Sequence, residues 1–344
     1  MYSMGVYRNT VENLRFALWW NHLIPPVLAT IYFAIALNGT PFNHAMIYVF
    51  EFIPIMIGIA GLGYFMNDLA DFKDDKSVGK KNIVNALPKK QLFLLVLFLL
   101  LCVIFPWTFL ELNWQVVALL LIQFGVYFLY SFPPFRFKER GILGILSDTF
   151  YGHVNPILVT IFTFLIISES YLWDVTIYPI GLIVLWAMSK GIRNIMLHQL
   201  DDRKNDLKTG SNTFVLRMGA LKSVNKINRA ILPIEISLVI ILVFMASAIL
   251  PFFYAGFLLF LFFTWLKFNG PKFLVMPRRQ FTFKFLYFMN NFYEEWLPIL
   301  ILISLSINRP VFLVLLVIHL ILFPKIMRNF YLDLKDIGKN LREL

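Results

Sequence analysis

A short acidic stretch, residues 67–75, holds the side chains best suited to chemistry in this chain. It reads Asn-Asp-Leu-Ala-Asp-Phe-Lys-Asp-Asp and follows a long apolar run. In a helix, Asp68, Asp71 and Asp75 are spaced at i, i+3 and i+7, so the three carboxylates share one face. Carboxylates this close repel one another unless water, basic groups or a hard cation such as Mg²⁺ surrounds them. The pattern therefore predicts a metal site for a phosphorylated ligand at the end of a membrane helix.

A second acidic cluster follows a later apolar run. A continuing helix would stack four polar residues, four positions apart, on one stripe that enters the bilayer: Asn194, His198, Asp202 and Asp206. Polar groups in a membrane are costly unless they face a cavity or a partner, and Gly210 is a suitable stop for this helix. For the first cluster alone, the alternative is a solvated acidic loop balanced by lysines, and Asp74, which lies off the shared face, fits that description. The second cluster favours a joint site.

The composition indicates which kind of secondary structure positions these clusters. The chain has 344 residues, of which 59% are hydrophobic and 15% charged, with a mean hydropathy of +0.72. A soluble protein carries about 25% charged residues. We therefore expect an all-α, polytopic membrane protein that forms a single domain over residues 1–344. Ten apolar segments approach the ~20 residues that span a bilayer, so nine or ten transmembrane helices are expected, at 16–38, 44–66, 91–111, 114–132, 143–167, 175–197, 230–250, 252–268, 286–307 and 310–328.

Charge predicts the orientation of these helices. The chain carries 31 Lys+Arg against 20 Asp+Glu, for a net charge of +11. Lys and Arg gather in the loops 67–90, 133–142, 198–229 and 267–284, whereas the alternate loops near 39–43, 106–113, 168–174 and 250–252 have none. The positive-inside rule places the basic loops and both acidic clusters in the cytoplasm, as a cytoplasmic cap. We expect an integral protein of a plasma or inner membrane whose basic excess meets membrane lipids, and no nucleic acid partner.

Two acidic faces interleaved with lysines and arginines suit diphosphate chemistry. Carboxylates hold Mg²⁺, the metal bridges diphosphate oxygens, and basic side chains neutralise the remaining charge. Diphosphate leaves readily only when its developing negative charge is stabilised. The surrounding apolar helices would house a long lipid tail. These residues therefore predict ionisation of a polyprenyl diphosphate to an allylic cation, followed by capture of that cation.

Three motifs resemble the UbiA superfamily of intramembrane prenyltransferases. Residues 67–75 match its Asn-Asp-x-x-Asp-x-x-x-Asp signature, and Asp202 and Asp206 resemble its second, Asp-x-x-x-Asp motif, followed by Gly210 and Thr213. Residues 130–138, Tyr-Ser-Phe-Pro-Pro-Phe-Arg-Phe-Lys, look like the family's loop after the fourth helix. The resemblance covers about residues 10 to 250 and is specific, because the three motifs occur in order at matching helix ends.

The resemblance implies helices around a central cavity that opens sideways to lipid, and prenyl transfer to a lipophilic acceptor, aromatic or otherwise. It also implies a Mg²⁺–diphosphate site, with Arg136 and Lys138 near the phosphates and Asn67 orienting the site. The metal ligands carried over are Asp68, Asp71, Asp75, Asp202 and Asp206, of which Asp68, Asp71, Asp202 and Asp206 are the expected catalytic residues. The chain departs from the family at His198-Gln199 and at Arg203 to Asn205, between the ends of the second motif, and in having a tenth apolar segment. These departures leave the acceptor open.

Several further residues admit two interpretations. Lys80 and Lys81 either bind phosphate or only determine topology. Arg193 and Asn194, with His198, are candidates for diphosphate binding, but Arg193 and Asn194 could instead join helices by hydrogen bonds. His153 is either an acceptor-side base or, as we favour, a packing residue. Asn21 and His22 in the first apolar segment pose the same choice.

Two other functions compete with prenyl transfer. A terpene cyclase of the same family would keep the diphosphate site and let the substrate's own double bonds capture the cation. A membrane transporter would place its binding groups near the bilayer midplane, often at broken helices. The acidic clusters instead lie at helix ends, and the apolar segments are mostly free of charge. Product analysis with a prenyl diphosphate as sole substrate, and Mg²⁺-dependent diphosphate release, would separate the three.

Overall fold

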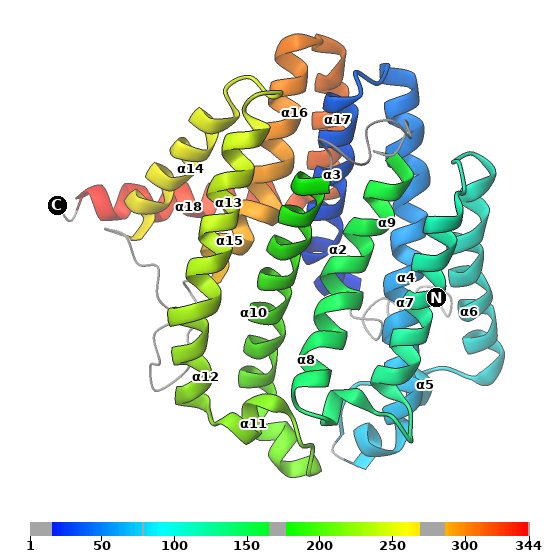
Figure 1. Cartoon of the computed structure of the whole chain (residues 1–344). Helices are drawn as coiled ribbons and strands as arrows, with labels where there is room; N and C mark the ends of the chain where they lie inside the picture. The colour runs from blue at the N-terminus through cyan, green and yellow to red at the C-terminus, as the bar shows by residue number, and fades with distance from the viewer. Residues whose placement is uncertain (1–15, 78, 165–176, 269–285, 343–344) are drawn as a thin grey trace, which may run out of the picture.

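The structure is a computed structural model that describes residues 16–77, 79–164, 177–268 and 286–342 (Figure 1). Within those ranges every regular element is a helix. The first half contains α2 (Phe16–His22), α3 (Ile24–Leu37), α4 (Phe42–Ser77), α5 (Ile83–Ala86), α6 (Lys89–Ile104), η1 (Phe105–Thr108), α7 (Trp114–Ser131), η2 (Phe137–Glu139), α8 (Ile142–Thr149), η3 (Phe150–Val154) and α9 (Asn155–Phe164). The second half contains α10 (Ile177–Thr209), α11 (Phe214–Met218), α12 (Ala220–Lys226), η4 (Ile227–Ile231), α13 (Leu232–Ala246), α14 (Phe253–Phe268), α15 (Leu286–Asn291), η5 (Phe292–Trp296), α16 (Leu297–Asn308), η6 (Pro310–Phe312), α17 (Leu313–Leu322) and α18 (Pro324–Arg342).

Each of the ten predicted apolar segments is mainly helical over its described part, which confirms an all-α membrane protein. Six helices are long and apolar enough to cross a membrane, and α17 and α18, bent by 82°, would make a seventh if counted as one span. The helix α14 is shorter. The segments 142–164 and 286–308 are interrupted by the π-helical turns η3 and η5. Hydropathy alone does not register such breaks, because they change backbone hydrogen bonding and not composition.

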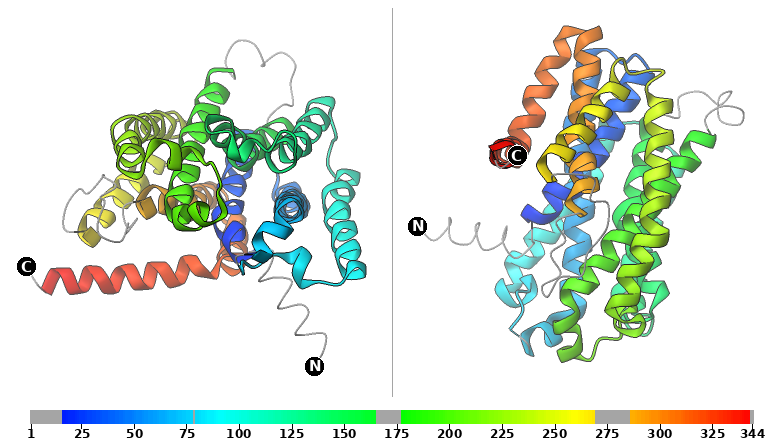
Figure 2. Two further views of the ribbon diagram at one scale, coloured as in Figure 1. Left: turned by 90° about the horizontal axis from the view of Figure 1, so that it is seen from below. Right: turned by 90° about the vertical axis from the view of Figure 1, so that its left-hand side faces the viewer.

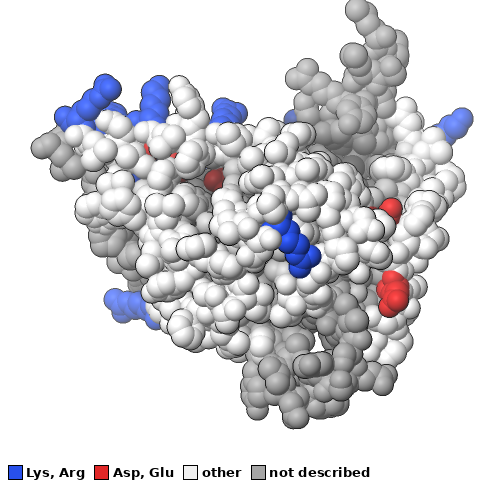
Figure 3. Space-filling view, turned by 90° about the horizontal axis from the view of Figure 1, so that it is seen from above, with Lys and Arg blue, Asp and Glu red and all other residues white. Residues whose placement is uncertain are grey.

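The two longest helices, α4 with 36 residues and α10 with 33, carry the two acidic clusters at their ends. Both ends lie at the bottom of the bundle in Figure 1, together with α5, α11 and α12. The opposite end, viewed in Figure 3, is mostly uncharged surface with isolated charged side chains. The two clusters therefore lie at the same end of the molecule, as the sequence predicts. Figure 2 shows the same helices from below.

Glycines allow α4 to approach its neighbours closely. A Cβ at Gly58 would lie 2.6 Å from the carbonyl oxygen of Leu99 on α6, and one at Gly63 would lie 2.6 Å from the ring of Tyr127 on α7. The Tyr127 hydroxyl then donates a hydrogen bond of 3.1 Å to the carbonyl of Ile59. Small residues at these contacts let membrane helices pack backbone to side chain. This packing fixes the height and rotation of the helix that carries the first acidic cluster.

A separate small core holds the end of α10. Ile195 and Leu200 pack with Val215 of α11 and Val224 of α12, and are buried apart from the main core. The side-chain oxygen of Gln199 accepts a 3.2 Å hydrogen bond from the Val215 amide. The predicted helix stop is confirmed, since α10 ends at Thr209 and Gly210 has the left-handed φ of +70°. The second acidic cluster is thus placed by a compact turn and not by a free loop.

Candidate active site

A cavity of about 480 Å³ lies between the long helices. Its walls come from α2, α3, α4, α7, α8, η3, α9, α10, α15 and η5. Five aromatic side chains line it: Trp19, Tyr64, Tyr127, Tyr130 and Tyr151. Its polar lining residues are His22, Asn67, Asp148, His153, Asn194, His198, Asp201, Asn290 and Glu294. A cavity with aromatic walls and convergent polar groups is the usual form of a small-molecule site.

The first acidic cluster, at the end of α4, contacts the start of the short helix α5. Asp68 is buried, and its Oδ2 accepts a 2.8 Å hydrogen bond from the Ile83 amide. Asn82 donates to Asp75 Oδ2 at 2.9 Å and to the Asp68 carbonyl at 2.8 Å, and it also caps α5. The shared face of Asp68, Asp71 and Asp75 therefore exists, but two of its carboxylates are held by the loop that follows. Sequence spacing could not predict these contacts, which are made by the next helix.

The third carboxylate of that face, Asp71, forms ion pairs with two cations from a distant loop. Lys138 Nζ contacts both Asp71 oxygens and also donates to Asn67 Oδ1 at 3.3 Å. Arg136 reaches Asp71 at 3.2 Å and the exposed Asp74 at 3.0 Å. Burial lowers the pKa of the Lys138 ammonium, and the charge of Asp71 opposes that shift. Asp74 is thus paired as well as exposed.

Arg136 is held in an unusual backbone conformation, with a φ of 39°. Side chains other than glycine rarely adopt this left-handed region, and residues that do so cluster at functional sites. The same loop starts where α7 ends, and the Arg136 amide donates to the Phe132 carbonyl at 2.8 Å. This geometry turns the loop back over the end of α4.

The second cluster faces the first across the same end of the bundle. Asp206 accepts a 3.1 Å hydrogen bond from the Thr213 hydroxyl, and Asp202 lies 3.7 Å from His198 Nε2. Lys80 lies 3.9 Å from Asp75 and its charge acts on Asp206 as well. The charges of Asp71 and Asp206 both act on the hydroxyl of Tyr130, which lines the cavity. The two clusters therefore converge on one region.

The cavity-facing side of α10 differs from the predicted stripe. Asn194, His198 and Asp201 line the cavity, whereas Asp202 and Asp206 do not. A helix has 3.6 residues per turn, so each step of four residues drifts by about 40°, and three steps carry Asp206 roughly 120° away from Asn194. Asp201, seven residues after Asn194, returns to within about 20° of it. Asp201 could have been placed on the cavity-facing side from the sequence, if each residue had been counted as a rotation of about 100° about the helix axis.

Other predicted residues lie apart from the acidic clusters. Arg193 is fully buried, with bonds of 2.6 and 2.8 Å to Glu235 and of 2.9 Å each to Asn290 and Asn194. Its place in the structure matches the alternative of hydrogen bonding between helices. Lys81 is exposed beyond the end of α4. His153 lines the cavity from η3.

Sequence analysis missed the polar groups contributed by the ninth apolar segment. Glu294 and Asn290 line the cavity, and Glu294 Oε2 lies 2.6 Å from His22 Nδ1. Glu295, the next residue, is buried too, but it accepts a hydrogen bond from Asn329 of α18 at 2.6 Å. Polar residues in this apolar segment were visible in the sequence, but their partners lie on other helices. Glu294, Asn290 and Glu295 meet residues that are 272, 97 and 34 positions away.

The described residues contain no ready-made group of three or more His, Cys, Asp or Glu side chains that would enclose a metal. Mg²⁺, however, is commonly held by one or two carboxylates together with substrate phosphates, and not by a cage made of protein alone. The two clusters supply hard carboxylate oxygens. Asp71 already pairs with two cations and so occupies a position that requires positive charge. The residues fit a Mg²⁺ ion that is bridged by a diphosphate.

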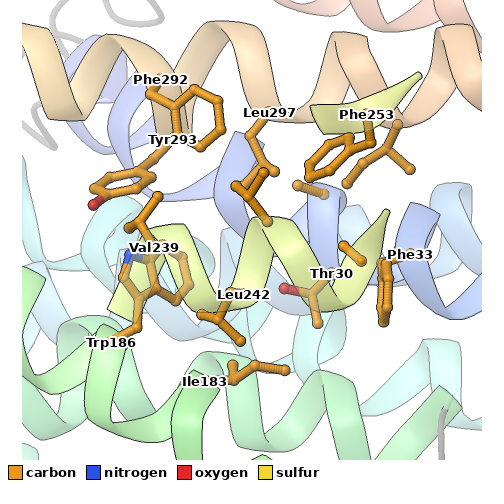
Figure 4. A pocket seen from close by; sticks show the side chains of 14 residues that line it. Thr30, Phe33, Ile183, Trp186, Val239, Leu242, Phe253, Phe292, Tyr293 and Leu297 are labelled. Carbon is orange, nitrogen blue, oxygen red and sulfur yellow. The ribbon is translucent and has the colours of Figure 1, made fainter. Parts of the chain in front are cut away.

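A smaller, apolar pocket of about 110 Å³ lies beside the main cavity (Figure 4). The π-helical turn η5 contributes Phe292 and Tyr293 to this pocket and Glu294 to the main cavity. Its remaining lining is aliphatic or aromatic, apart from the hydroxyl of Thr30. The pocket offers an apolar space next to the polar cavity.

These features define a class: a polytopic helical membrane protein with an acid-lined cavity near the ends of its two longest helices. The sequence pattern of the UbiA prenyltransferase family matches residues 23–292, which is most of the chain, so the chain belongs to that family. No curated protein sequence matches it.

Solved structures agree with this assignment at the level of the fold. A UbiA homolog from Archaeoglobus fulgidus bound to GPP and Mg²⁺ is 15% identical, with a TM-score of 0.54, over 85% of this chain and 99% of that one. A structure of a UbiA homolog from the same organism with DMAPP and Mg²⁺ gives the same values, and one with Cd²⁺ gives 16% identity and a TM-score of 0.53. At this identity the likeness shows a common fold alone.

Proposed function

We propose that this protein is a Mg²⁺-dependent prenyltransferase that moves a prenyl group from a polyprenyl diphosphate to a lipophilic acceptor within the membrane. Membership of the UbiA family supports this proposal. So does the fold shared with homologs whose structures hold GPP or DMAPP with Mg²⁺. The observation that carries it is the pairing of Asp71 with Lys138 and Arg136 beside a cavity with aromatic walls.

The residues divide the work by their chemistry. Lys138 and Arg136 would donate charge-assisted hydrogen bonds to diphosphate oxygens in place of Asp71. Asp71, released from these cations, would join Asp68, Asp75, Asp202 and Asp206 as ligands of a divalent metal, with Asn67 orienting the diphosphate. When bound, Mg²⁺ supplies positive charge to the leaving oxygens. We place the active-site loops in the cytoplasm, where Lys80 would neutralise charge between the two clusters.

The reaction then breaks the bond between C1 of the prenyl chain and the diphosphate oxygen, which keeps the electron pair. The allylic cation lies among Tyr130, Tyr151 and Trp19, whose ring faces stabilise positive charge. A nucleophilic atom of the acceptor forms the new bond to C1 and loses a proton. The prenyl tail needs an apolar space, which the cavity and the pocket of Figure 4 offer.

The test is a product assay on the full-length protein in membranes. Prenyl diphosphates of several lengths are incubated with a lipid extract, with Mg²⁺ or with EDTA, and products are identified by mass spectrometry. We expect a prenylated lipid and free diphosphate that both require the metal. Asp71→Asn should lower turnover by about a thousandfold or more, whereas the exposed Asp74→Asn serves as the matched control. Full turnover in EDTA or in Asp71→Asn would refute the proposal.

A terpene cyclase is the second candidate, and the aromatic lining of the cavity suits it equally well. A cyclase needs no acceptor. Incubation with a prenyl diphosphate as the sole substrate would then yield a cyclised hydrocarbon. Absence of diphosphate release under every condition would instead favour transport.

A further inference from the structure

A histidine–carboxylate pair stands in the wall of the main cavity, away from both acidic clusters. His22 ends α2, and Glu294 lies in the π-helical turn η5. Glu294 Oε2 is 2.6 Å from His22 Nδ1, and both residues line the cavity. They fall just outside the two ends of the matched family pattern, residues 23–292. The pair belongs to none of the three motifs discussed above.

The hydrogen bond determines which histidine nitrogen is available. An ionised carboxylate only accepts hydrogen bonds, so the proton of a neutral His22 lies on Nδ1 and points at Glu294. The side chain of His22 makes no second hydrogen bond to the described residues. Its side chain is 36% exposed while that of Glu294 is 6% exposed. Nε2 is therefore left with a free lone pair on a ring that borders the cavity. A base oriented by a second residue is the arrangement that activates hydroxyl nucleophiles.

The local backbone supports a specific placement of Glu294. A π-helical turn inserts one residue and changes which side chains face inward, and such turns are frequent at functional sites. In η5 the adjacent carboxylates point to different partners, since Glu294 meets His22 and Glu295 meets Asn329. Another π-helical turn, η3, contributes Tyr151 and His153 to the same cavity. Two π-helical turns thus border one cavity.

The charges of the cavity lining restrict the acceptor. The lining includes three carboxylates, Asp148, Asp201 and Glu294, and no lysine or arginine among the described residues. Desolvating an anion beside these groups would be costly. The nearby cations, Lys190 and Arg193, are buried outside the lining, and Arg193 is already bonded to Glu235. An acceptor that reaches His22 should therefore be neutral and should carry a hydrogen-bond donor.

We propose that His22, oriented by Glu294, is the acceptor-side general base and that the acceptor is a neutral, lipophilic hydroxyl compound. This inference rests on the proposed prenyl transfer. As the acceptor attacks C1 of the prenyl cation, its hydroxyl proton passes to His22 Nε2. The new bond joins C1 to the acceptor oxygen, which has lost its proton to the histidine. The electron pair of the broken bond remains on the diphosphate, and Glu294 stabilises the imidazolium that forms.

The pair could instead serve only to join α2 to η5. The experiment therefore separates binding of the donor from its transfer. Full-length protein in nanodiscs is given GPP, Mg²⁺ and a lipid extract as the pool of acceptors. Product formation is followed by mass spectrometry. The affinity for a non-cleavable thio-analogue of GPP is measured in parallel.

His22→Ala and Glu294→Gln should lower the rate of product formation by about a hundredfold or more, the usual contribution of a general base. The affinity for the analogue should change less than threefold. Added imidazole should restore part of the activity of His22→Ala but not of Glu294→Gln, because only the former leaves a space for it. Glu295→Gln and His44→Asn are the matched controls, since Glu295 faces α18 and His44 is exposed at the start of α4. Both should behave as the native protein.

The acceptor class is tested with the same extract after its hydroxyl groups have been acetylated. Product from the native protein should fall to background. Unchanged product would overturn the hydroxyl assignment, and rates within threefold of native in both pair variants would overturn the role of the base. Loss of analogue binding in those variants would also overturn it, since the pair would then hold the site together. If the native protein binds the analogue yet forms no product from any extract, the proposed function itself fails.

Discussion

Two groups of ion pairs in this protein use the same chemistry in opposite surroundings. The mouth cluster, defined as Asp71, Asp74, Arg136 and Lys138, lies at the end of α4 and is partly open to water. The interior network, defined as Arg193, Glu235, Tyr293 and Asn290, is enclosed in the bundle, and both charged groups of its central pair are 0% exposed. Both contain a guanidinium bound to a carboxylate.

The two sets of ion pairs differ in whether a ligand could replace one of the partners. In the interior network Arg193 forms two bonds to Glu235, which also accepts from the Tyr293 hydroxyl at 2.9 Å, so every charge is satisfied by protein. A buried pair of this kind is costly to form but far more costly to break. In the mouth cluster the cations come from the segment that follows α7, and the side chains of Arg136 and Lys138 are 26% and 15% exposed. We expect them to be able to turn from Asp71 to phosphate oxygens. The comparison indicates that the interior network joins the helices of the bundle, and we expect the mouth cluster to exchange its ion pairs for a ligand.

The largest expected effect comes from breaking the interior network. Glu235→Ala leaves the Arg193 guanidinium buried without its carboxylate, which should cost about 3–5 kcal/mol of stability. The measurement is thermal unfolding of the purified protein in detergent. The double variant Arg193→Met with Glu235→Leu should recover most of the loss, because no unpaired charge remains. An equal loss in the double variant would show that packing, and not charge, is responsible.

The next effect tests the mouth cluster as a binding site. Lys138→Met removes one charge-assisted hydrogen bond, so the affinity for a non-cleavable prenyl diphosphate analogue should fall about tenfold to a hundredfold. The unfolding temperature should change little, since Asp71 can still reach Arg136 and water. Calorimetric titration in nanodiscs measures the first quantity. A large fall in stability with unchanged affinity would place Lys138 with the interior network instead.

A smaller effect concerns the residue that positions the acidic face. Asn82→Ala removes hydrogen bonds to Asp75 and to the Asp68 carbonyl as well as the cap of α5, which should cost about 1–3 kcal/mol. Affinity for the analogue should weaken with stability, because Asp75 loses its anchor. Asn85→Ala, whose side chain is exposed and bonds only the Phe72 carbonyl, is the control. Equal effects of the two changes would contradict this role.

The smallest effect is expected at the edge of the mouth cluster. Asp74 is 56% exposed and pairs with Arg136 through water-accessible atoms. Such pairs contribute about 0–1 kcal/mol, so Asp74→Ala should change the free energy of unfolding by no more than about this amount. Its turnover should stay within about twofold of native. A loss of turnover comparable to that of Asp71→Asn would show that Asp74 takes part in binding.

The sequence predicted those parts of the molecule that depend on local periodicity. The helical class, the acidic face of α4 and the stop at Gly210 all follow from spacing along one helix. Contacts between segments far apart in the chain could not be predicted from this spacing. Lys138 meets Asp71 across 67 residues, and Glu235 meets Arg193 across 42.

Isolated charges in apolar segments were the hardest to interpret. Glu235 and Glu294 are both acids within mainly apolar segments, although Glu294 has the polar neighbours Asn290, Asn291 and Glu295. Glu235 is saturated by a guanidinium and a tyrosine, whereas Glu294 is turned by η5 toward a histidine in a cavity. Only the positions of their partners separate the two, and those partners lie on other helices.

The length of α4 has a consequence for how a substrate would travel. Its 36 residues, at about 1.5 Å each, make it roughly 54 Å long, while the hydrocarbon layer is about 30 Å thick. Because charged groups are costly in hydrocarbon, we expect the turns that carry Asp68, Asp71 and Asp75 to extend beyond this layer and the aromatic cavity to lie within it. An amphiphile could enter from the side with its tail already dissolved and its head already hydrated. The protein would then work at the boundary between water and lipid. Neither the head nor the tail of the substrate would have to be transferred from one medium to the other.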